Sequence, residues 1–297
     1  MIVIFRGSFL TVRSLLLIAI CLCGVAGRAL GQGPALPFPD TRYYRSVSAG
    51  PHSEVSTANG ELSTSIPIVH LKGLGNTSID VDVLFRSNSV AGTSYGAANN
   101  QPGAGWYLST FRAMTNLNVA YDNTFAETEG IDQVNWWSAV YNANNTYTCT
   151  ASPGTRETLV TNTNASGNIT SYIVTDEKTL NTYTYGFNPA TSGALTGVMW
   201  FSKITDIYGN MVNYGYTLEP SDQAYRLNTI SDSSGRTVTF NYASTSPYVL
   251  STIVLTAGGN TRTWGFDYGS GNGTLLLGWI YPPNVNGQTR RRRPPDQ

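Results

Sequence analysis

The sequence predicts an all-β fold built from antiparallel hairpin repeats, and three observations support this prediction. The 297 residues are rich in Thr, Asn, Gly, Ser and Tyr and poor in Lys and Glu, a composition that favours strands and turns over helices. Beyond the first 31 residues, no stretch combines apolar residues at the 3.6-residue spacing of a helix with helix caps. A short hairpin-like unit also recurs between residues 201 and 242.

Residues 1–31 have the layout of a secretory signal peptide. Arg6 and Arg13 precede an apolar run, Leu15–Val25, and small residues allow cleavage after Gly31, with cleavage after Gly27 as the second choice. The run of about 11 residues is shorter than the roughly 20 that a membrane-spanning helix needs, so we expect no stable membrane span. The mature chain is therefore expected to be exported and to be secreted or held at the cell surface.

Cleavage would leave a slightly acidic chain with one cysteine. It removes three of the 18 basic residues, so 15 basic and 18 acidic side chains remain, and Cys149 is the remaining thiol. One cysteine cannot form an internal disulfide. The two histidines, His52 and His70, supply neither a nucleophile pair with Cys149 nor the spacing of a zinc site. We expect an idle thiol, no metal, no cofactor and no nucleic-acid partner.

The next segments are expected to be a linker and a β-rich region. Residues 32–46 contain Pro34, Pro37 and Pro39, which fix φ and cannot donate to a strand ladder, so they predict an extended linker. Residues 47–200 form the β-rich region that precedes the repeats, and Asn59-Gly60 is its strongest turn signal.

One strand of this region is clear from its alternation. Ile79, Val81, Val83 and Phe85 share an apolar face, and the intervening Asp80 and Asp82 lie on the other face. A solvated face is favoured over a metal site for these two aspartates, because no third ligand follows at calcium-loop spacing.

Residues 110–200 are less regular, with Asn-rich turns between aromatic strands. Within them, Trp136-Trp137 is either a sugar-stacking platform or a core anchor. We favour the core, because aromatic side chains dominate core burial.

The internal repeat lies in Phe201–Tyr216 and Leu227–Tyr242, which align without a gap. Asp at the first position of a four-residue turn accepts backbone NH groups, and Gly at its end tolerates positive φ, so each unit predicts a hairpin. After the turn, alternate residues fall on one strand face that must be buried. The turn residues are Asp206, Gly209, Asp232 and Gly235, and the strand face comprises Val212, Tyr214, Tyr216, Val238, Phe240 and Tyr242.

Weaker copies follow these two units. A third runs from Leu250 to Tyr268, and a fourth begins at Leu277, so the repeat region is placed at 201–283. Residues 284–297, with Arg290–Arg293, are expected to form a basic, disordered tail.

These units resemble the YD repeats of the Rhs family, whose most characteristic element is an Asp-x-x-Gly-Asn/Arg turn followed by Val-x-Tyr/Phe-x-Tyr. Upstream, Asn59–Pro67, the strand 79–86 and Gly103–Ser109 resemble the segment that precedes the repeats in that family. The resemblance implies hairpins stacked into an open, spiralling sheet, as part of a toxin-associated shell that can enclose a C-terminal effector domain. Three to four units cannot enclose a cargo, so we expect a natural short form or a fragment.

The function predicted from these features is that of a non-catalytic structural and interaction module of an exported Rhs-like protein. Its expected partners are carbohydrate or cell-surface molecules, and further repeats and an effector domain of the same protein. A carbohydrate-binding module is the alternative, because Tyr and Trp can stack on sugars. A glycosidase using paired carboxylates is the second alternative. Asp206 and Asp232 do not favour it, because the repeat already gives them a structural role.

Overall fold

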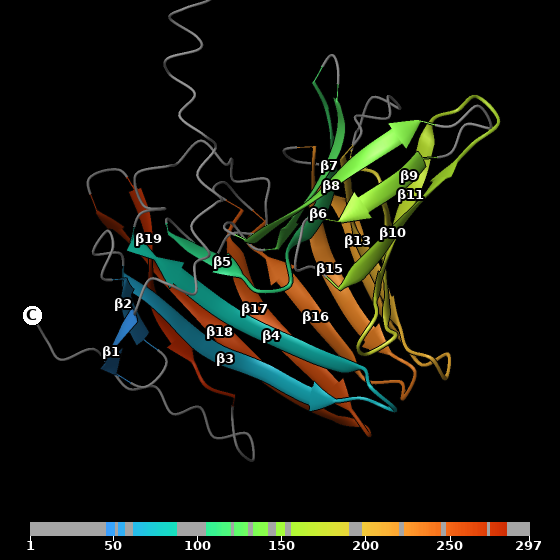
Figure 1. Cartoon of the computed structure of the whole chain (residues 1–297). Helices are drawn as coiled ribbons and strands as arrows, with labels where there is room; N and C mark the ends of the chain where they lie inside the picture. Colours follow the sequence, from blue (N-terminus) through green and yellow to red (C-terminus); the bar gives the residue numbers. More distant parts are fainter. Residues whose placement is uncertain are drawn as a thin grey trace, which may run out of the picture.

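The computed structural model consists of antiparallel strands in two open sheets, which confirms the predicted all-β class (Figure 1). It describes residues 46–50, 53–56, 62–87, 105–119, 122–129, 133–141, 147–151, 156–189, 198–219, 223–244, 248–271 and 274–283. The predicted signal peptide, the tail and His52 lie outside these ranges, as does the linker up to residue 45. No helix in the described ranges has the length and apolar character needed to cross a bilayer.

The smaller sheet has five strands that follow one another in chain order. Its fourth strand shows why it forms, because Ile79, Val81 and Val83 are fully buried on one face while Asp80 is exposed on the other. The strands are β1 (Ser46–Gly50), β2 (Ser53–Ser56), β3 (Leu62–Lys72), β4 (Ser78–Arg86) and β5 (Trp106–Leu108).

The larger sheet contains the repeat hairpins. The first unit forms the hairpin β13–β14, the second β15–β16 and the third β17–β18, and β19 corresponds to the start of the fourth. The bounds are β13 (Val198–Thr205), β14 (Met211–Glu219), β15 (Ala224–Asp232), β16 (Thr237–Tyr242), β17 (Leu250–Ala257), β18 (Asn260–Gly271) and β19 (Thr274–Tyr281).

The same sheet continues upstream through a branch at β13. Trp200 pairs with β12 on one side and with β6 on the other, whereas Lys203 to Thr205 pair with β12 and β14. The expected boundary at residue 201 therefore falls inside one strand. The upstream strands are β6 (Arg112–Val119), β7 (Asp122–Glu129), β8 (Gln133–Tyr141), β9 (Tyr147–Ala151), β10 (Glu157–Thr163), β11 (Ile169–Asp176) and β12 (Thr182–Phe187).

The main core lies between the smaller sheet and the repeat hairpins, which face each other as two layers (Figure 1). Ile79, Val81 and Val83 meet the strand face of the repeats there. In that face Val212, Val238 and Phe240 are fully buried, and Tyr214, Tyr216 and Tyr242 pack against the same core. The smaller sheet thus covers the apolar face that each hairpin would otherwise expose.

A second core fills the curl of the sheet around β6 to β13. Phe125, Trp137, Tyr172 and Tyr185 are all fully buried in it. Trp137 is therefore a core residue, as favoured from the sequence. The side chain of Trp136 is not among those that the structure describes.

A repeated tyrosine hydrogen bond closes each unit at the end opposite its turn. The hydroxyls of Tyr216, Tyr242 and Tyr268 donate to the carbonyl oxygens of residues 201, 227 and 250, at 2.7, 3.0 and 2.7 Å. Burial raises the pKa of all three phenols well above 10, so they remain protonated donors. Each acceptor is the first residue of the donor's own unit, so the bond fixes the length of the repeat.

We expect Tyr216→Phe and Tyr242→Phe each to lower the free energy of unfolding by about 1 kcal/mol, because each leaves a buried carbonyl without its hydroxyl donor. Urea unfolding followed by fluorescence measures this loss. Tyr208→Phe is the matched control, because that residue is 75% exposed. Equal stability of all three variants and the wild type would contradict the structural role of the bonds.

Candidate functional site

The two predicted aspartates each organise a hairpin turn at one end of the sandwich. Asp206 is 5% and Asp232 9% exposed. One carboxylate oxygen of Asp206, Oδ1, accepts the amides of Tyr208 and Asn210, both at 2.9 Å. In the second turn, Oδ1 of Asp232 accepts two amides at 3.0 Å each, at the corresponding positions 234 and 236. One oxygen thus satisfies two backbone donors in each turn.

The glycines supply the left-handed backbone that these turns require. Gly209 has a φ of 81° and Gly235 a φ of 76°. Their amides donate to the carbonyl oxygens of Asp206 and Asp232, at 3.1 and 3.0 Å. A β-carbon at either glycine would meet nothing within 4 Å, so backbone conformation alone selects Gly there.

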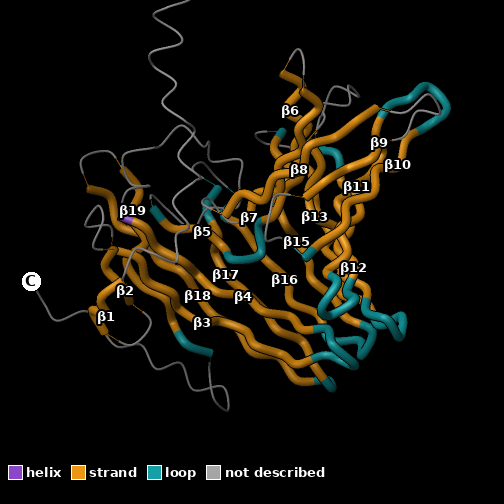
Figure 2. The backbone as a smooth tube through the Cα atoms, in the orientation of Figure 1, coloured by secondary structure: helices purple, strands orange, loops and turns teal. Residues whose placement is uncertain are grey.

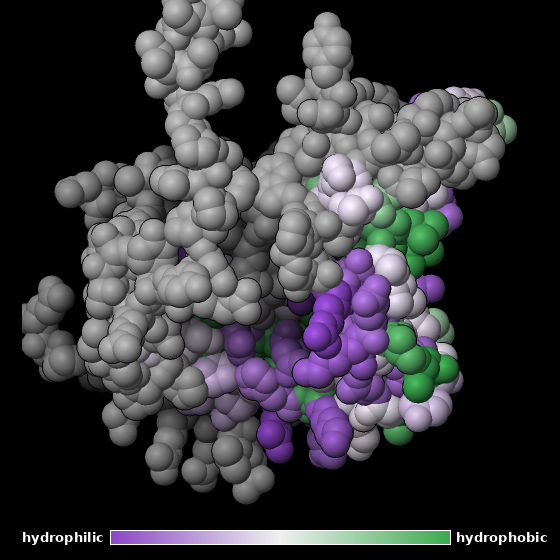
Figure 3. Space-filling view, viewed as in Figure 1, coloured by the Kyte–Doolittle hydropathy of each residue, from purple (hydrophilic) through white to green (hydrophobic). Residues whose placement is uncertain are grey.

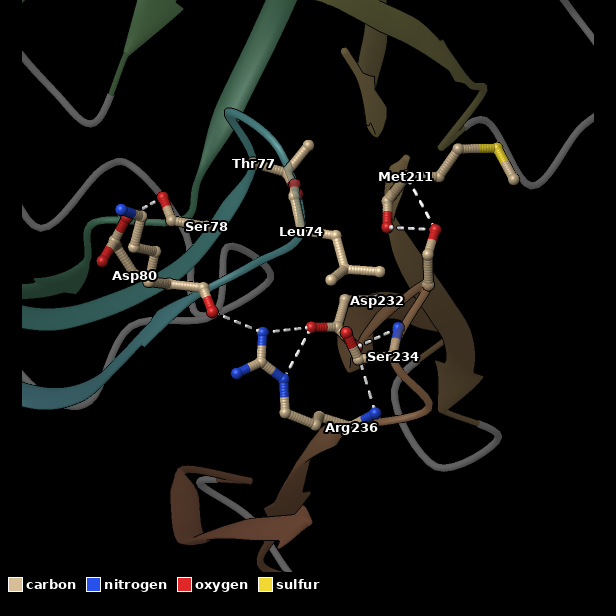
Figure 4. Close-up of polar contacts among 10 residues, drawn as sticks. Leu74, Thr77, Ser78, Asp80, Met211, Asp232, Ser234 and Arg236 are labelled. Atoms are coloured by element: carbon tan, nitrogen blue, oxygen red, sulfur yellow. Dashed lines mark hydrogen bonds and ion pairs between the residues drawn. The ribbon is translucent and has the colours of Figure 1, made fainter. Parts of the chain in front are cut away.

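The residue after each glycine holds the second carboxylate oxygen. Asn210 Nδ2 donates to Asp206 Oδ2 at 2.9 Å. In the second turn Arg236 Nε donates to Asp232 Oδ2 at 2.7 Å, as Figure 4 shows. This contact gives a physical reason for Asn or Arg at that position of the repeat, because both side chains carry donors that reach back four residues.

The turns also bind the hairpin between β3 and β4, which belongs to the other sheet. The amide of Asn76 donates to Asp206 Oδ2 at 3.2 Å, and Arg236 Nη2 donates to the carbonyl oxygen of Lys72 at 2.9 Å. Gly75, with a φ of 62°, lies so close that a β-carbon there would be 2.0 Å from Asp206 Oδ2. The Asp turns therefore join the two sheets.

Two further turns of the same kind were not predicted from the sequence. Asp176 accepts the amides of Lys178 and Thr179, and its own amide donates to the carbonyl of Asn181 at 3.0 Å. This turn is one residue longer and has Leu180, at a φ of 59°, where the others have glycine. An alignment without gaps hides it.

The other missed turn runs from Asn164 to Asn168, between β10 and β11. Asn164 Oδ1 accepts the amides of Ser166 and Asn168 at 3.0 Å each, and Gly167 has a φ of 80°. The sequence Asn-Ala-Ser-Gly-Asn has the spacing of the repeat turn, but Asn replaces Asp at its first position. A search that accepted either residue would have found it.

Hydrogen bonding makes Asp206 a stronger acid than usual. Partial desolvation acts to raise its pKa, but donors from the side chain and amide of Asn210 and from the amides of Asn76 and Tyr208 outweigh that effect. The pKa of Asp206 is therefore lowered below 3.8.

Asp80 and Asp82 hold a histidine on the outer face of the smaller sheet. His70 Nδ1 lies 2.9 Å from Asp80 Oδ1, and Nε2 lies 2.9 Å from Asp82 Oδ1. Partial burial acts to lower the pKa of His70, but the two carboxylates outweigh it and raise that pKa above 6.5. In the described part of the chain, no group of three or more His, Cys, Asp or Glu side chains could hold a metal ion.

Cys149 lies half-buried in β9. Burial raises the pKa of its thiol to about 11, so the thiol is protonated at neutral pH.

No protein-family model and no curated protein sequence matches the chain. Among solved structures, it is similar to the N-terminal domain of the effector protein SpvB from Salmonella typhimurium strain LT2. The TM-score is 0.50 and the identity 9%, over 73% of this chain and 97% of that domain. This likeness shows a shared fold.

Two larger assemblies contain similar regions. The Tc holotoxin pore of Photorhabdus luminescens gives a TM-score of 0.48 at 11% identity, over 79% of this chain and 15% of that one. The TcdB2-TccC3 structure gives 0.47 at 10% identity, over 80% and 16%.

We expect Gly75→Ala to destabilise the fold more than Gly209→Ala, although both glycines have positive φ. Gly209→Ala should cost about 1 kcal/mol of unfolding free energy through backbone strain alone. Gly75→Ala should cost at least about 2 kcal/mol, because its methyl group also displaces the Asp206 carboxylate. Urea unfolding compares the two, and equal losses would show that the β3–β4 hairpin does not depend on this close approach.

Acid should weaken the fold through the Asp206 carboxylate. Because its pKa is lowered on folding, its contribution to stability is fully present above pH 3.8 and is lost as pH falls through the lower folded-state value. Asp176, whose pKa is also lowered, adds loss in the same range. The melting temperature of Asp206→Asn should therefore depend less on pH below about 5 than that of the wild type. Parallel curves for the two proteins would contradict this assignment.

Proposed function

We propose that this chain is a non-catalytic structural module of an exported, toxin-associated Rhs-like repeat protein, and that further hairpins of the same protein extend its larger sheet. The observation that carries the proposal is the strand β19. It lies at one end of the 14-stranded sheet and has a neighbour, β18, on one side only among the described strands.

The sequence of β19 suits a strand that receives a partner. Its eight residues, Thr274–Tyr281, include neither a charged residue nor a proline. Exposed edges are usually blunted by such residues, because unpaired NH and C=O groups attract other strands. Leu276 and Trp279 are 42% and 53% exposed on this strand. An edge of this kind is a template for pairing.

The position of β19 in the repeat indicates which strand would pair with it. β13, β15 and β17 are the first strands of their units, and each pairs with the second strand of its unit, β14, β16 or β18. β19 is the first strand of a fourth unit. A second strand of the same unit would therefore occupy its free edge and continue the sheet.

The similarity to an N-terminal domain of an effector protein supports this role, since it shows that the same fold occurs at the start of such a protein. The signal-peptide layout of residues 1–31 supports export. A non-catalytic role is proposed because the carboxylates of Asp206 and Asp232 are committed to backbone and side-chain donors within their turns.

Carbohydrate binding is the second candidate, and exposed Trp279 is the observation that favours it, because an exposed indole can stack on a sugar ring. A glycan array probed with the wild type and with Trp279→Ala separates the two. Selective binding that Trp279→Ala abolishes would favour the carbohydrate-binding module over the structural one.

We expect the purified protein to self-associate through β19, and Leu276→Lys to restore the monomer, because a charge on an edge strand disfavours pairing. Sedimentation velocity measures the change. Hydrogen exchange of the monomeric variant should be faster in residues 274–281 than in β16, which is paired on both sides.

Leu62→Lys is the matched control for this experiment. Leu62 is similarly exposed, at 37%, but lies in β3, which has neighbours on both sides. A wild type that is strictly monomeric, with β19 as well protected as β16, would show that the edge is covered and would contradict the proposed extension.

A further inference from the structure

Exposed apolar side chains gather on the turns at one end of the sandwich. In the described part of the chain, five of the nine large apolar side chains that are exposed lie on or directly after three turns. They are Leu74 between β3 and β4, Leu180 between β11 and β12, and Ile207, Tyr208 and Met211 between or next to β13 and β14. We call Leu74, Leu180, Ile207 and Tyr208 the tip patch.

Hydrogen bonds hold the three turns together. Asn76, in the turn of Leu74, donates its amide to Asp206 Oδ2 at 3.2 Å, and its carbonyl accepts Asn181 Nδ2 at 3.1 Å. Several turns gather at the lower right of Figure 2, and apolar surface is visible at that end in Figure 3. The three turns that carry the tip patch are thus linked to one another by hydrogen bonds.

Leu180, one of the exposed side chains of the tip patch, has a strained backbone conformation. It has a φ of 59°, a conformation that bulky residues rarely adopt, and its side chain is 51% exposed. The equivalent position is glycine in the other turns of this kind, at Gly167, Gly209 and Gly235. A strained leucine that gains little burial within the chain indicates a use outside it.

The shape and size of the tip patch favour a lipid surface over a protein partner. Its side chains lie on hairpin turns, where Leu74, Leu180 and Ile207 are about half exposed and Tyr208 is 75% exposed. A stable protein interface takes roughly 20 to 30 residues from each side. Insertion into a bilayer interface needs only a few apolar side chains, and tyrosine is enriched at that depth.

The charges beside the tip patch fit anionic headgroups. Lys72 precedes the turn of Leu74, and Lys178 lies in the turn of Leu180, and both are exposed. Glu177 is the exposed acid beside them. The other acids of these turns are Asp176, in the turn of Leu180, and the buried Asp206 and Asp232, and all three accept hydrogen bonds from donors within their own turns.

We propose that the tip patch inserts into the interfacial region of a lipid bilayer, with Leu180, Ile207 and Tyr208 in the acyl boundary and Lys72 and Lys178 at the headgroups. This inference does not depend on the proposed function, because it uses the end of the sandwich and not the edge of the sheet.

Flotation with lipid vesicles tests the proposal, using the chain recovered after export. Vesicles of phosphatidylcholine alone and of equimolar phosphatidylcholine and phosphatidylserine are compared. The wild type is expected to float with both, and more strongly with the anionic ones. The double variant Ile207→Ser/Tyr208→Ser should bind at least about tenfold more weakly to both, because it removes two inserted side chains.

Two further variants separate binding from folding. Leu180→Gly should bind severalfold more weakly while its urea midpoint is unchanged or higher, because glycine relieves the positive φ. Val160→Ser is the matched control. Val160 is 54% exposed, as is Ile207, but lies in β10 away from the three turns, so this variant should bind like the wild type.

Several results would overturn the proposal. One is a wild type that floats with neither vesicle type, and another is equal loss of binding in Val160→Ser. Binding that needs phosphatidylserine and is unaffected by the double variant would show an electrostatic contact in place of insertion. If the wild type does not bind vesicles but forms a dimer, and the double variant is a monomer, the tip patch is a protein interface.

Discussion

The carboxylate of Asp206 is the interaction on which most of this structure depends. It accepts two backbone amides of its own turn, the side chain of Asn210 and the amide of Asn76 from the other sheet. The first three contacts shape a repeat hairpin, and the fourth holds the smaller sheet over the apolar face of that hairpin. Because a single buried side chain serves both purposes, the local turn and the packing of the two layers are coupled.

The first two repeat units are each fixed at both of their ends by polar contacts, while the apolar face of the unit is buried between them. The Asp turn closes one end, and at the other end a buried tyrosine hydroxyl binds the carbonyl of the first residue in the unit. In the third unit the tyrosine bond is kept, but the turn is Gly258-Gly259, with φ values of 56° and 77°. Two glycines meet the requirement for positive φ without a carboxylate, so the tyrosine contact is the more constant feature.

The sequence predicts those parts of the fold in which one residue type meets one local requirement. Alternation identified β4, and the spacing from Asp206 to Tyr216 identified a hairpin, because both patterns reflect contacts within a few residues. The cover formed by β3 and β4 could not be inferred in the same way. It depends on contacts between Asn76 and Asp206, which lie 130 residues apart.

The turn of Asp176 was missed for a local reason, since Leu180 occupies a position whose conformation indicates glycine. The branch at β13 was missed for a topological one. A single strand there pairs with β6 and β14 along one side, and no pattern within β13 encodes two neighbours on the same side.

The free edge of β19 and the tip patch can bind their partners at the same time, because they lie on different sides of the molecule. New strands would add beside β19, across the sheet, whereas the tip patch lies at the ends of strands. Each added hairpin would bring another turn to that end, but a turn alone does not make an apolar tip. The second unit has Ser233 and Ser234 where the first has Ile207 and Tyr208, and the third has two glycines. The apolar side chains thus belong to particular turns and not to the repeat as such.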